Sequence, residues 1–268
     1  MALPPPQQNA WAVVTGASSG IGSDLARELA SRGHSLILVA RRKDRLDTLA
    51  LALKHRYGVQ VEVRPCDLSD RAARAALRDE LAALNVSVLC NNAGFATFGS
   101  FATLPAERER EELELDVVAV HELTHAVVPG MCARGEGAIL ITGSTAGFQP
   151  MPTGATYSAS KAFANTFSEA LHSELKHRGI TCTLLAPGPV LSEFSQVAKV
   201  GHIDRAVPGV WLSSERVARD AVKGMERGKR LVVPGLIATI AACSGRHTPR
   251  AILLPIIHRV LGGVSRAA

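Results

Sequence analysis

The sequence predicts an α/β protein in which helices cover both faces of a doubly wound parallel sheet. Short, almost entirely apolar segments alternate with longer segments of helical periodicity from residue 10 to residue 186. Strands that are apolar on both faces are typical of a buried parallel sheet, because antiparallel sheets usually leave one face in water. The 268 residues, 47% of them hydrophobic, suffice for one large core, so we expect a single domain.

The expected elements follow one another without long gaps. Residues 10–15 and 35–40 are apolar runs, and residues 59–63 alternate valine with polar side chains. Between the first two runs, Leu25 and Leu29 are one helical turn apart, and Gly33 ends that helix. The remaining expected strands are residues 86–90, 138–142 and 180–186, and the expected helices are residues 24–32, 43–56, 69–84, 107–133 and 157–178.

Three parts of unequal size are expected. Residues 1–9, rich in proline, form a flexible arm, residues 10–230 form the main domain, and residues 231–268 form a C-terminal extension. The first residues lack the basic start and apolar run of a signal peptide, and no segment reaches the ~20 apolar residues of a membrane-spanning helix. With five cysteines and no Cys-x-x-Cys pair, the sequence favours a reducing, cytoplasmic setting.

Nucleic acids and metals are disfavoured as ligands. The net charge of +6 comes from residues 227–268, which contain seven Lys or Arg and no acid, so the first 226 residues hold 23 basic and 24 acidic side chains. Aromatic residues make up only 4% and do not alternate with basic ones, as single-strand binding would require. His121 and His125 share a helix face but lack a third metal ligand at a readable spacing.

A glycine-rich turn lies between the first strand and the first helix, where a doubly wound fold binds phosphate. Small residues there let the backbone approach a pyrophosphate, and the following helix N-terminus supplies free N–H groups. A tight turn that needs positive φ would also explain the glycines, although the position after the first strand favours a dinucleotide. The candidate contacts are Gly16, Ser18, Ser19, Gly20, Ile21 and Gly22.

Arg41 and Arg42 follow the second strand, at the position that meets the adenosine ribose of a dinucleotide in this fold. An acid there would accept from the 2′-hydroxyl of NAD, whereas arginine accommodates the 2′-phosphate of NADP. Neither position holds an acid, and a guanidinium binds phosphate with paired hydrogen bonds. We therefore predict NADP(H), with Arg41 the stronger candidate for this contact; two solvated arginines at a helix start are the alternative.

Further motifs follow the later strands in order. They are Asp67-Leu68, Asn92-Ala93-Gly94, Ser144, Tyr157 with Lys161, and Pro187-Gly188-Pro189-Val190. Together with the Gly-x-x-x-Gly-x-Gly turn, these motifs and their order make residues 10–195 resemble the short-chain dehydrogenase/reductase family. The resemblance implies a Rossmann-type fold and an NADP-dependent oxidoreductase that interconverts a ketone and an alcohol.

The resemblance also implies cofactor contacts. Asp67 and Leu68 would meet the adenine, although Asp67 could instead cap a helix. Asn92, Ala93 and Gly94 would pass beneath the adenosine ribose. Near the nicotinamide, the implied contacts are Pro187, Gly188, Val190 and Ser192, and the hydroxyl of Ser192 replaces that of the threonine usual in the family.

Tyr157 and Lys161 are four residues apart, so a helix brings both to one face. A tyrosine titrates at ~10, but a nearby ammonium and a bound nicotinamide cation favour the phenolate. The resemblance implies that Tyr157 donates a proton to the developing alkoxide, that Lys161 lowers the pKa of Tyr157 and holds the ribose hydroxyls, and that Ser144 hydrogen-bonds the substrate oxygen.

Asp116 departs from the family pattern. Many members have an asparagine at this position, which holds a water that leads protons to the lysine. An ionised carboxylate can hold that water only as an acceptor and adds a charge near Lys161. A shifted alignment, or a polar residue with purely structural partners, is the alternative interpretation of Asp116.

The loops beyond the strand ends are mostly apolar and predict a hydrophobic carbonyl substrate. They include Phe95, Phe98, Phe148 and Met151, although core packing would explain the last two equally well. The chain looks like the ketoacyl-reductase-like subgroup, which includes reductases of long β-keto lipids of the mycolate type. Steroid or xenobiotic ketones are alternative substrates, and a non-catalytic NADP-sensing protein is the alternative of another class.

The C-terminal extension combines arginines with branched apolar residues. This composition suits a helix on an anionic lipid surface, a lid over an acyl chain, or a dimer contact. The resemblance implies a homodimer or homotetramer formed through the two long helices. We expect a cytoplasmic protein, associated with a membrane if the extension lies on lipid.

Overall fold

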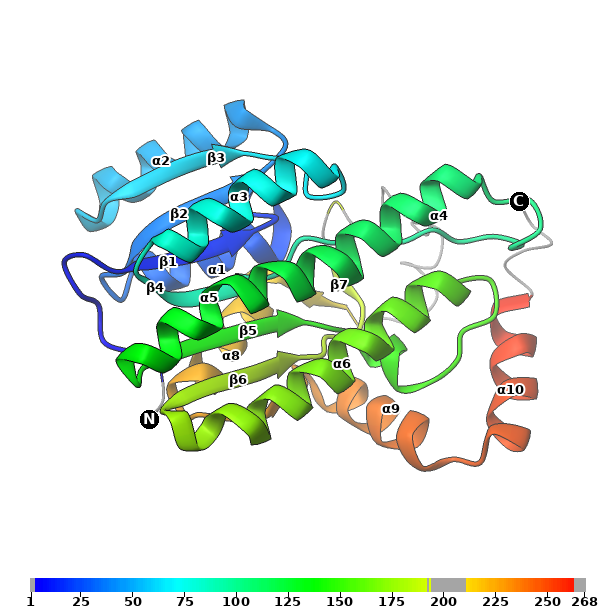
Figure 1. Ribbon diagram of the computed structural model, residues 1–268. Helices are drawn as coiled ribbons and strands as arrows, with labels where there is room; N and C mark the ends of the chain where they lie inside the picture. Colours follow the sequence, from blue (N-terminus) through cyan, green and yellow to red (C-terminus); the bar gives the residue numbers. More distant parts are fainter. Residues whose placement is uncertain (1–2, 192, 194–210, 263–268) are drawn as a thin grey trace.

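The computed structural model describes residues 3–191, 193 and 211–262. Within them, seven parallel strands form one sheet in the order β3-β2-β1-β4-β5-β6-β9 (Figure 1). They are β1 (Trp11–Thr15), β2 (Ser35–Ala40), β3 (Val61–Pro65), β4 (Val86–Asn91), β5 (Gly137–Thr142), β6 (Ile180–Leu185) and β9 (Leu231–Val232). The strand order reverses between β1 and β4, where a doubly wound sheet forms its binding crevice. The predicted fold class is confirmed.

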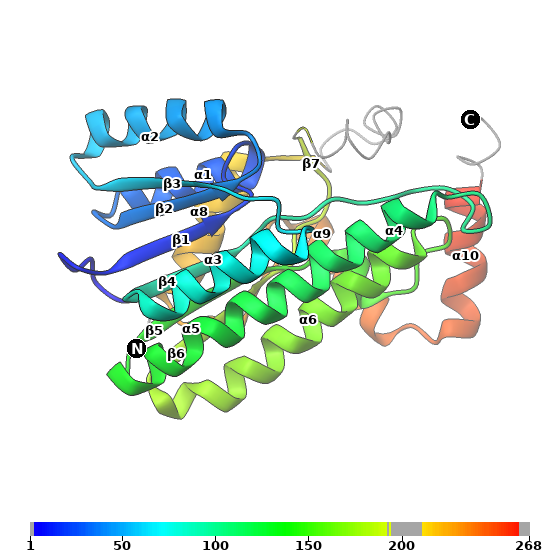
Figure 2. The same cartoon turned by 45° about the horizontal axis from the view of Figure 1, so that its top comes forward.

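Helices cover both faces of the sheet (Figure 2). One layer consists of α1 (Gly20–Ala30), α2 (Lys43–Tyr57) and α8 (Ser214–Glu226), and the other of α3 (Arg71–Ala83), α5 (Val120–Arg134) and α6 (Ala155–Leu175). Outside the sheet, β7 (Val190–Leu191) pairs with β8 (Leu212–Ser213). Because crossover helices lie on both sides, the sheet is buried on both faces.

The core reproduces the two-sided apolar pattern of the strands. Ala12 and Val14 of β1 pack with Leu25 of α1, whereas Val13 packs with Leu123 of α5, and each of these side chains is fully buried. Burial of a Val or Leu side chain contributes about 1.5–3 kcal/mol. The apolar side chains on both strand faces, from which the sheet was predicted, therefore also stabilise it.

The structure differs from the predicted element bounds in four main places. The third strand is Val61–Pro65 rather than residues 59–63, and the first helix starts at Gly20 rather than residue 24, because the glycine-rich turn itself enters the helix. The helix expected at residues 107–133 is α4 (Ala106–Leu113), a π-helical turn η1 (Glu114–Ala119) and α5. The helix expected to reach residue 178 ends in a 3₁₀ turn, η3 (Lys176–Arg178).

The first described residues and the start of the expected extension both contact the main body. Leu3 donates its N–H to the carbonyl oxygen of Met225 at 3.1 Å. The first residues of the expected extension, Leu231 and Val232, pair with β6 as the last strand of the sheet. Helices α9 (Leu236–His247) and α10 (Arg250–Gly262) follow at one end of the molecule (Figure 1). The division into three parts stays a prediction.

None of the helices in the described ranges combines the length and the apolar character that crossing a membrane requires.

Arg74 of α3 is a buried cation, 1% exposed, that joins three elements. Its guanidinium donates to Glu114 Oε2 at 2.7 Å, to Glu122 Oε2 at 3.0 Å and to the carbonyl oxygen of Leu68 at 2.8 Å. It therefore holds α3, η1 and α5 together and fixes the segment that follows β3.

We expect Arg74→Met to lower the free energy of unfolding by about 2–4 kcal/mol, because the buried carbonyl and two half-buried carboxylates lose their donor. Arg78→Met is the matched control, since Arg78 lies on the same helix with its side chain 39% exposed and should matter by less than about 0.5 kcal/mol. Urea unfolding of both variants provides the comparison. Equal losses would contradict a special contribution of the buried network.

Candidate active site

A cavity of about 590 Å³ opens where the strands of the sheet end. Most of the predicted site residues line it, namely Gly16, Ser18, Ser19, Gly20, Ile21, Arg41, Arg42, Asp67, Leu68, Asn92, Ala93, Gly94, Ser144, Tyr157, Lys161, Pro187, Gly188 and Val190. Gly22 and Asp116 do not line the cavity, but both lie next to residues that do. Ser192 lies outside the described residues. The sheet thus brings together residues that are far apart in the sequence.

The glycine-rich turn packs closely against the end of β4. Gly16 has a φ of +69°, and a Cβ there would lie 2.9 Å from the Cα of Ala93. Thr15 Oγ1 accepts hydrogen bonds from the N–H groups of Asn92 at 2.9 Å and Ala93 at 3.0 Å. Ser19, at the N-terminus of α1, makes no side-chain bond to the helix. This cradle of closely packed backbone at a helix N-terminus fits a dinucleotide pyrophosphate.

Arg42 lies beside the same turn. Its guanidinium donates to the hydroxyl oxygens of Ser18 and Ser19, each at 2.8 Å, and to Glu193 Oε2 at 2.8 Å. Hydrogen bonds from Arg42 and Arg45 lower the pKa of Glu193 to about 2. The side chain of Arg41 is 65% exposed and lies 3.8 Å from Asp67. Arg42, rather than Arg41, is therefore the arginine bound to the phosphate-binding turn.

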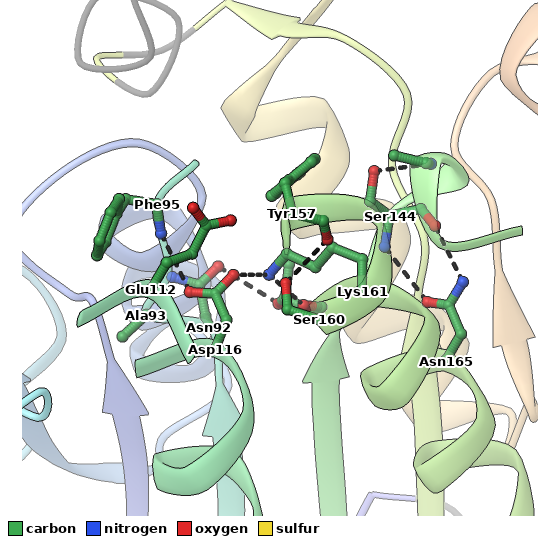
Figure 3. A network of polar contacts seen from close by, with 12 residues as sticks. Asn92, Ala93, Phe95, Glu112, Asp116, Ser144, Tyr157, Ser160, Lys161 and Asn165 are labelled. Atoms are coloured by element: carbon green, nitrogen blue, oxygen red, sulfur yellow. Dashed lines mark hydrogen bonds and ion pairs between the residues drawn. The ribbon is translucent and has the colours of Figure 1, made fainter. Parts of the chain in front are cut away.

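Tyr157 and Lys161 lie on one face of α6, and both are buried (Figure 3). Lys161 Nζ lies 2.8 Å from Asp116 Oδ2 and donates to the carbonyl oxygen of Thr142 at 3.3 Å. Asp116 Oδ1 accepts from the N–H of Phe95 at 3.2 Å. The structure thus brings Asp116 beside Lys161, as expected from its match to the asparagine position of the family. The part of Asp116 in proton transfer stays a prediction.

The protonation of this pair follows from burial and charge. Burial raises the pKa of Tyr157 above its ordinary range and outweighs the lowering by Lys161 and by a hydrogen bond with Ser144; Asp116 raises it further. Burial alone would lower the pKa of Lys161, but Asp116 raises it overall. Burial and Lys161 thus act on the titration of Tyr157 in opposite directions. The phenolate expected beside Lys161 and a bound nicotinamide stays a prediction.

Ser144 is held from two sides. Its hydroxyl accepts from the N–H of Ala146 at 3.1 Å, at the start of the 3₁₀ turn η2 (Thr145–Phe148). The side chain of Asn165 donates to the carbonyl oxygen of Ser144 at 3.0 Å and accepts from its N–H at 3.3 Å (Figure 3). Sequence reasoning missed Asn165, although its position one helical turn after Lys161 was an available signal.

The two ends of the cavity differ in chemistry. One end has the cradle and Arg42, which suit phosphate groups. At the other end, the ring of Phe98 meets that of Tyr157 edge-on, 5.7 Å between centroids, and Met151 lies nearby. The cavity can hold a dinucleotide along the strand ends and an apolar carbonyl compound against Tyr157 and Ser144.

A Rossmann-type sheet with this turn and this Ser, Tyr and Lys arrangement defines a dinucleotide-dependent oxidoreductase class. A family model described as short chain dehydrogenase matches residues 10–200. The chain therefore belongs to the short-chain dehydrogenase family, as its motifs predicted.

Several known proteins are similar to this chain. A very-long-chain 3-oxoacyl-CoA reductase of Laccaria bicolor is 39% identical over 201 residues, which are 74% of this chain and 60% of the relative. One of Anas platyrhynchos, with the same name, is 35% identical over 77% of this chain and 68% of the relative. A short-chain dehydrogenase from Sphingobium yanoikuyae, solved in complex with NADPH, is 35% identical over 92% of this chain and 95% of its own, with a TM-score of 0.80. These names confirm the predicted ketoacyl-reductase-like subgroup, and the NADPH complex agrees with the predicted cofactor.

Proposed function

We propose that the chain reduces a hydrophobic ketone to a secondary alcohol with NADPH. One observation carries the proposal: Tyr157, Ser144 and Lys161 converge at the apolar end of a cavity whose other end suits a dinucleotide phosphate. The names of the fungal and avian relatives support a β-ketoacyl group as the substrate class. Because the chain spans three fifths of the fungal relative, the substrate is inferred from the site as well as from that name.

NADP(H) fits the residues of the adenosine end. Arg42 already binds a carboxylate, Glu193, which carries the kind of charge that a 2′-phosphate would bring. Arg41 lies 3.8 Å from Asp67, and both residues also line the cavity. Asp67, Leu68, Asn92, Ala93 and Gly94 would line the adenosine, and Pro187, Gly188 and Val190 the nicotinamide.

The chain's own groups divide the reaction between them. NADPH, when bound, supplies the hydride that reduces the carbonyl carbon. Tyr157 gives its phenolic proton to the substrate oxygen as negative charge develops there. The hydroxyl of Ser144 hydrogen-bonds the same oxygen, and the ammonium of Lys161 stabilises the phenolate that Tyr157 leaves behind. The raised pKa of Tyr157 keeps the proton available at neutral pH.

Other functions have less support. Steroid or xenobiotic ketones would also suit an apolar pocket and remain the alternative substrates. Asp116 was the only residue that favoured a non-catalytic NADP sensor. Because Asp116 forms an ion pair with Lys161 and raises its pKa, it also fits a catalytic site. The intact Ser144, Tyr157 and Lys161 arrangement argues for an enzyme.

We propose that α9 and α10 attach the chain to an anionic membrane surface from the cytoplasm. Their exposed large apolar side chains are Leu236, Ile237, Ile240, Ile252, Leu254 and Ile256. Residues 227–268 carry seven basic and no acidic side chains, so electrostatic attraction would add to apolar insertion. A lid or a subunit contact is the alternative for this surface.

We also propose a homodimer or homotetramer formed through the long helices α5 and α6.

Tyr157→Phe should lower NADPH-dependent turnover of a long-chain β-ketoacyl thioester by at least about 10²-fold, because the phenolic proton is lost. NADPH affinity should stay within about twofold. The matched control is Tyr57→Phe, which removes the other tyrosine of the chain and should leave turnover unchanged. Turnover follows from NADPH absorbance and binding from NADPH fluorescence. Retained turnover in Tyr157→Phe would refute the assignment.

Arg42→Ala should reduce the preference for NADPH over NADH by about 10-fold or more, since a hydrogen bond to a charged group contributes about 1.5–3 kcal/mol. Kd values for both cofactors provide the measurement. Lys43→Ala is the control, because the Lys43 side chain is 66% exposed and pairs with Asp47. A wild-type preference below about threefold would contradict the NADP assignment.

Ile240→Asp should weaken co-sedimentation with vesicles of anionic phospholipid by about 10-fold, through loss of apolar burial and added repulsion. Leu51→Asp is the matched control, since Leu51 is an equally exposed apolar residue, 69% against 61%, on the distant helix α2. Binding should fall as salt rises. Equal sedimentation of the two variants would exclude this attachment surface.

A further inference from the structure

Three buried carboxyl groups form a row beside Lys161. Glu109, Glu112 and Asp116 follow one another at helical spacing through α4 and η1, and their exposed fractions are 9%, 0% and 1%. Carboxyl groups are seldom buried without compensation, because the ionised form loses its hydration. Asp116 has the charge of Lys161 as compensation, but Glu109 and Glu112 have no cation in contact within the described residues.

Thr97 joins Glu109 and Glu112. Its N–H donates to Glu112 Oε2 at 2.8 Å, and its Oγ1 lies 2.6 Å from the same oxygen and also contacts Glu109 Oε1. A threonine hydroxyl has only one hydrogen, so it can donate to one carboxylate at a time. Both contacts are hydrogen bonds only when one carboxyl group carries a proton. The geometry therefore indicates a proton in this cluster, and Glu112 is the carboxyl group whose pKa burial raises.

The second oxygen of Glu112 is the unusual atom in this row. Glu112 Oε1 is buried and has no hydrogen-bond partner among the described residues. Figure 3 shows the Glu112 carboxyl group on the same side of Lys161 as Asp116, toward the Tyr157 ring. A protonated oxygen in this place would be a donor facing the catalytic pair, whereas an ionised one would be a buried charge without compensation.

Burial, hydrogen bonds and neighbouring charges all act on the titration of Glu112. Burial raises the pKa of Glu112 to about 7; the charges of Asp116 and Glu109 raise it as well, and the hydrogen bonds from Thr97 oppose them. On α6, Glu112 in turn raises the pKa values of Tyr157 and Lys161. A carboxyl group that titrates near neutrality can both give and regain a proton under working conditions.

A route from this row toward solvent is also present. Thr156, the half-buried neighbour of Tyr157, donates to Glu109 Oε2. Thr156, Glu109, Thr97 and Glu112 thus form a continuous series of hydrogen bonds from a partly exposed hydroxyl to Oε2 of the buried Glu112 carboxyl group, whose other oxygen is Oε1. The series ends beside the Asp116–Lys161 pair.

We propose that Glu112 stores a proton between turnovers and returns it to Tyr157 through the Asp116–Lys161 pair. The inference rests on the proposed reduction, in which Tyr157 becomes a phenolate when it protonates the product. The O–H bond of Glu112 breaks and the O–H bond of Tyr157 forms again, with no change in oxidation state. The Glu112 carboxylate then regains a proton from solvent through Thr97, Glu109 and Thr156. Glu112 acts through other groups and does not touch the substrate.

The stored proton can be tested without any substrate. In infrared spectra of the full chain, the wild type should show the carbonyl stretch of a protonated carboxyl group at pH 6, and this band should fade as the pH rises through about 7. Glu112→Gln should remove the band. Glu111→Gln is the matched control, since Glu111 is the exposed neighbour paired with Arg108, and it should retain the band. A wild type without the band, or a band that survives in Glu112→Gln, would overturn the inference.

Kinetics with a long-chain β-ketoacyl thioester test the return of the proton. Glu112→Gln should lower steady-state kcat by about 10-fold, while hydride transfer in the first turnover stays within about twofold, because Tyr157 starts with its own proton. Glu112→Asp keeps a titratable group and should recover part of the loss. An equal fall of both rates would identify a purely structural residue and contradict the proposal. If the wild type oxidises no NADPH with any ketone, the proposed function fails, and the infrared titration still decides whether Glu112 holds a proton.

Discussion

The buried ammonium of Lys161 determines how the residues around it are arranged. A charge that is only 5% exposed costs several kcal/mol in lost hydration unless ionic and hydrogen-bonding partners replace water. Asp116 and the carbonyl oxygen of Thr142 replace it here. Gly94 leaves room for this pair, because a Cβ there would lie 3.0 Å from Asp116 Oδ1 and 3.2 Å from Lys161 Nζ and would require both to shift by a few tenths of an ångström. The π-helical turn that carries Asp116 belongs to the same arrangement, and such turns are frequent at functional sites.

The parallel sheet brings the site together because its strands all end at one edge. Motifs that follow β1, β2, β4 and β5 would be scattered in any other topology, yet they line one cavity here. Thr15 fixes the end of β1 relative to the end of β4, since its hydroxyl accepts hydrogen bonds from the N–H groups that follow β4. Arg74 does the same for the segment after β3 by holding the carbonyl oxygen of Leu68. Tertiary hydrogen bonds, and not the motifs alone, set the shape of the cavity.

The sequence predicts most of this arrangement, because strand ends and helical spacing follow local rules. The positions of Tyr157 and Lys161, four residues apart, required only the helical period. The residues that sequence reasoning missed depend on contacts between distant segments. Asn165 matters through the backbone of Ser144, and Glu112 through Thr97. The hydrogen bonds of Arg42 could not be predicted for the same reason, since its partners Ser18 and Ser19 lie more than twenty residues earlier in the chain; the preference for Arg41 as the phosphate contact stays a prediction.

Asp116, in place of the asparagine usual in the family, raises the pKa values of both Tyr157 and Lys161. An amide would leave the ammonium of Lys161 without a counter-charge, and the attraction of that ammonium for a phenolate would lower the pKa of Tyr157. Burial raises the pKa of Tyr157, and the charge of Asp116 raises it further. A protonated tyrosine can give a proton to a developing alkoxide, which is the step that the proposed reduction requires. A nearby carboxyl group that titrates near neutrality suits the same reaction, because each reduction consumes one proton at Tyr157.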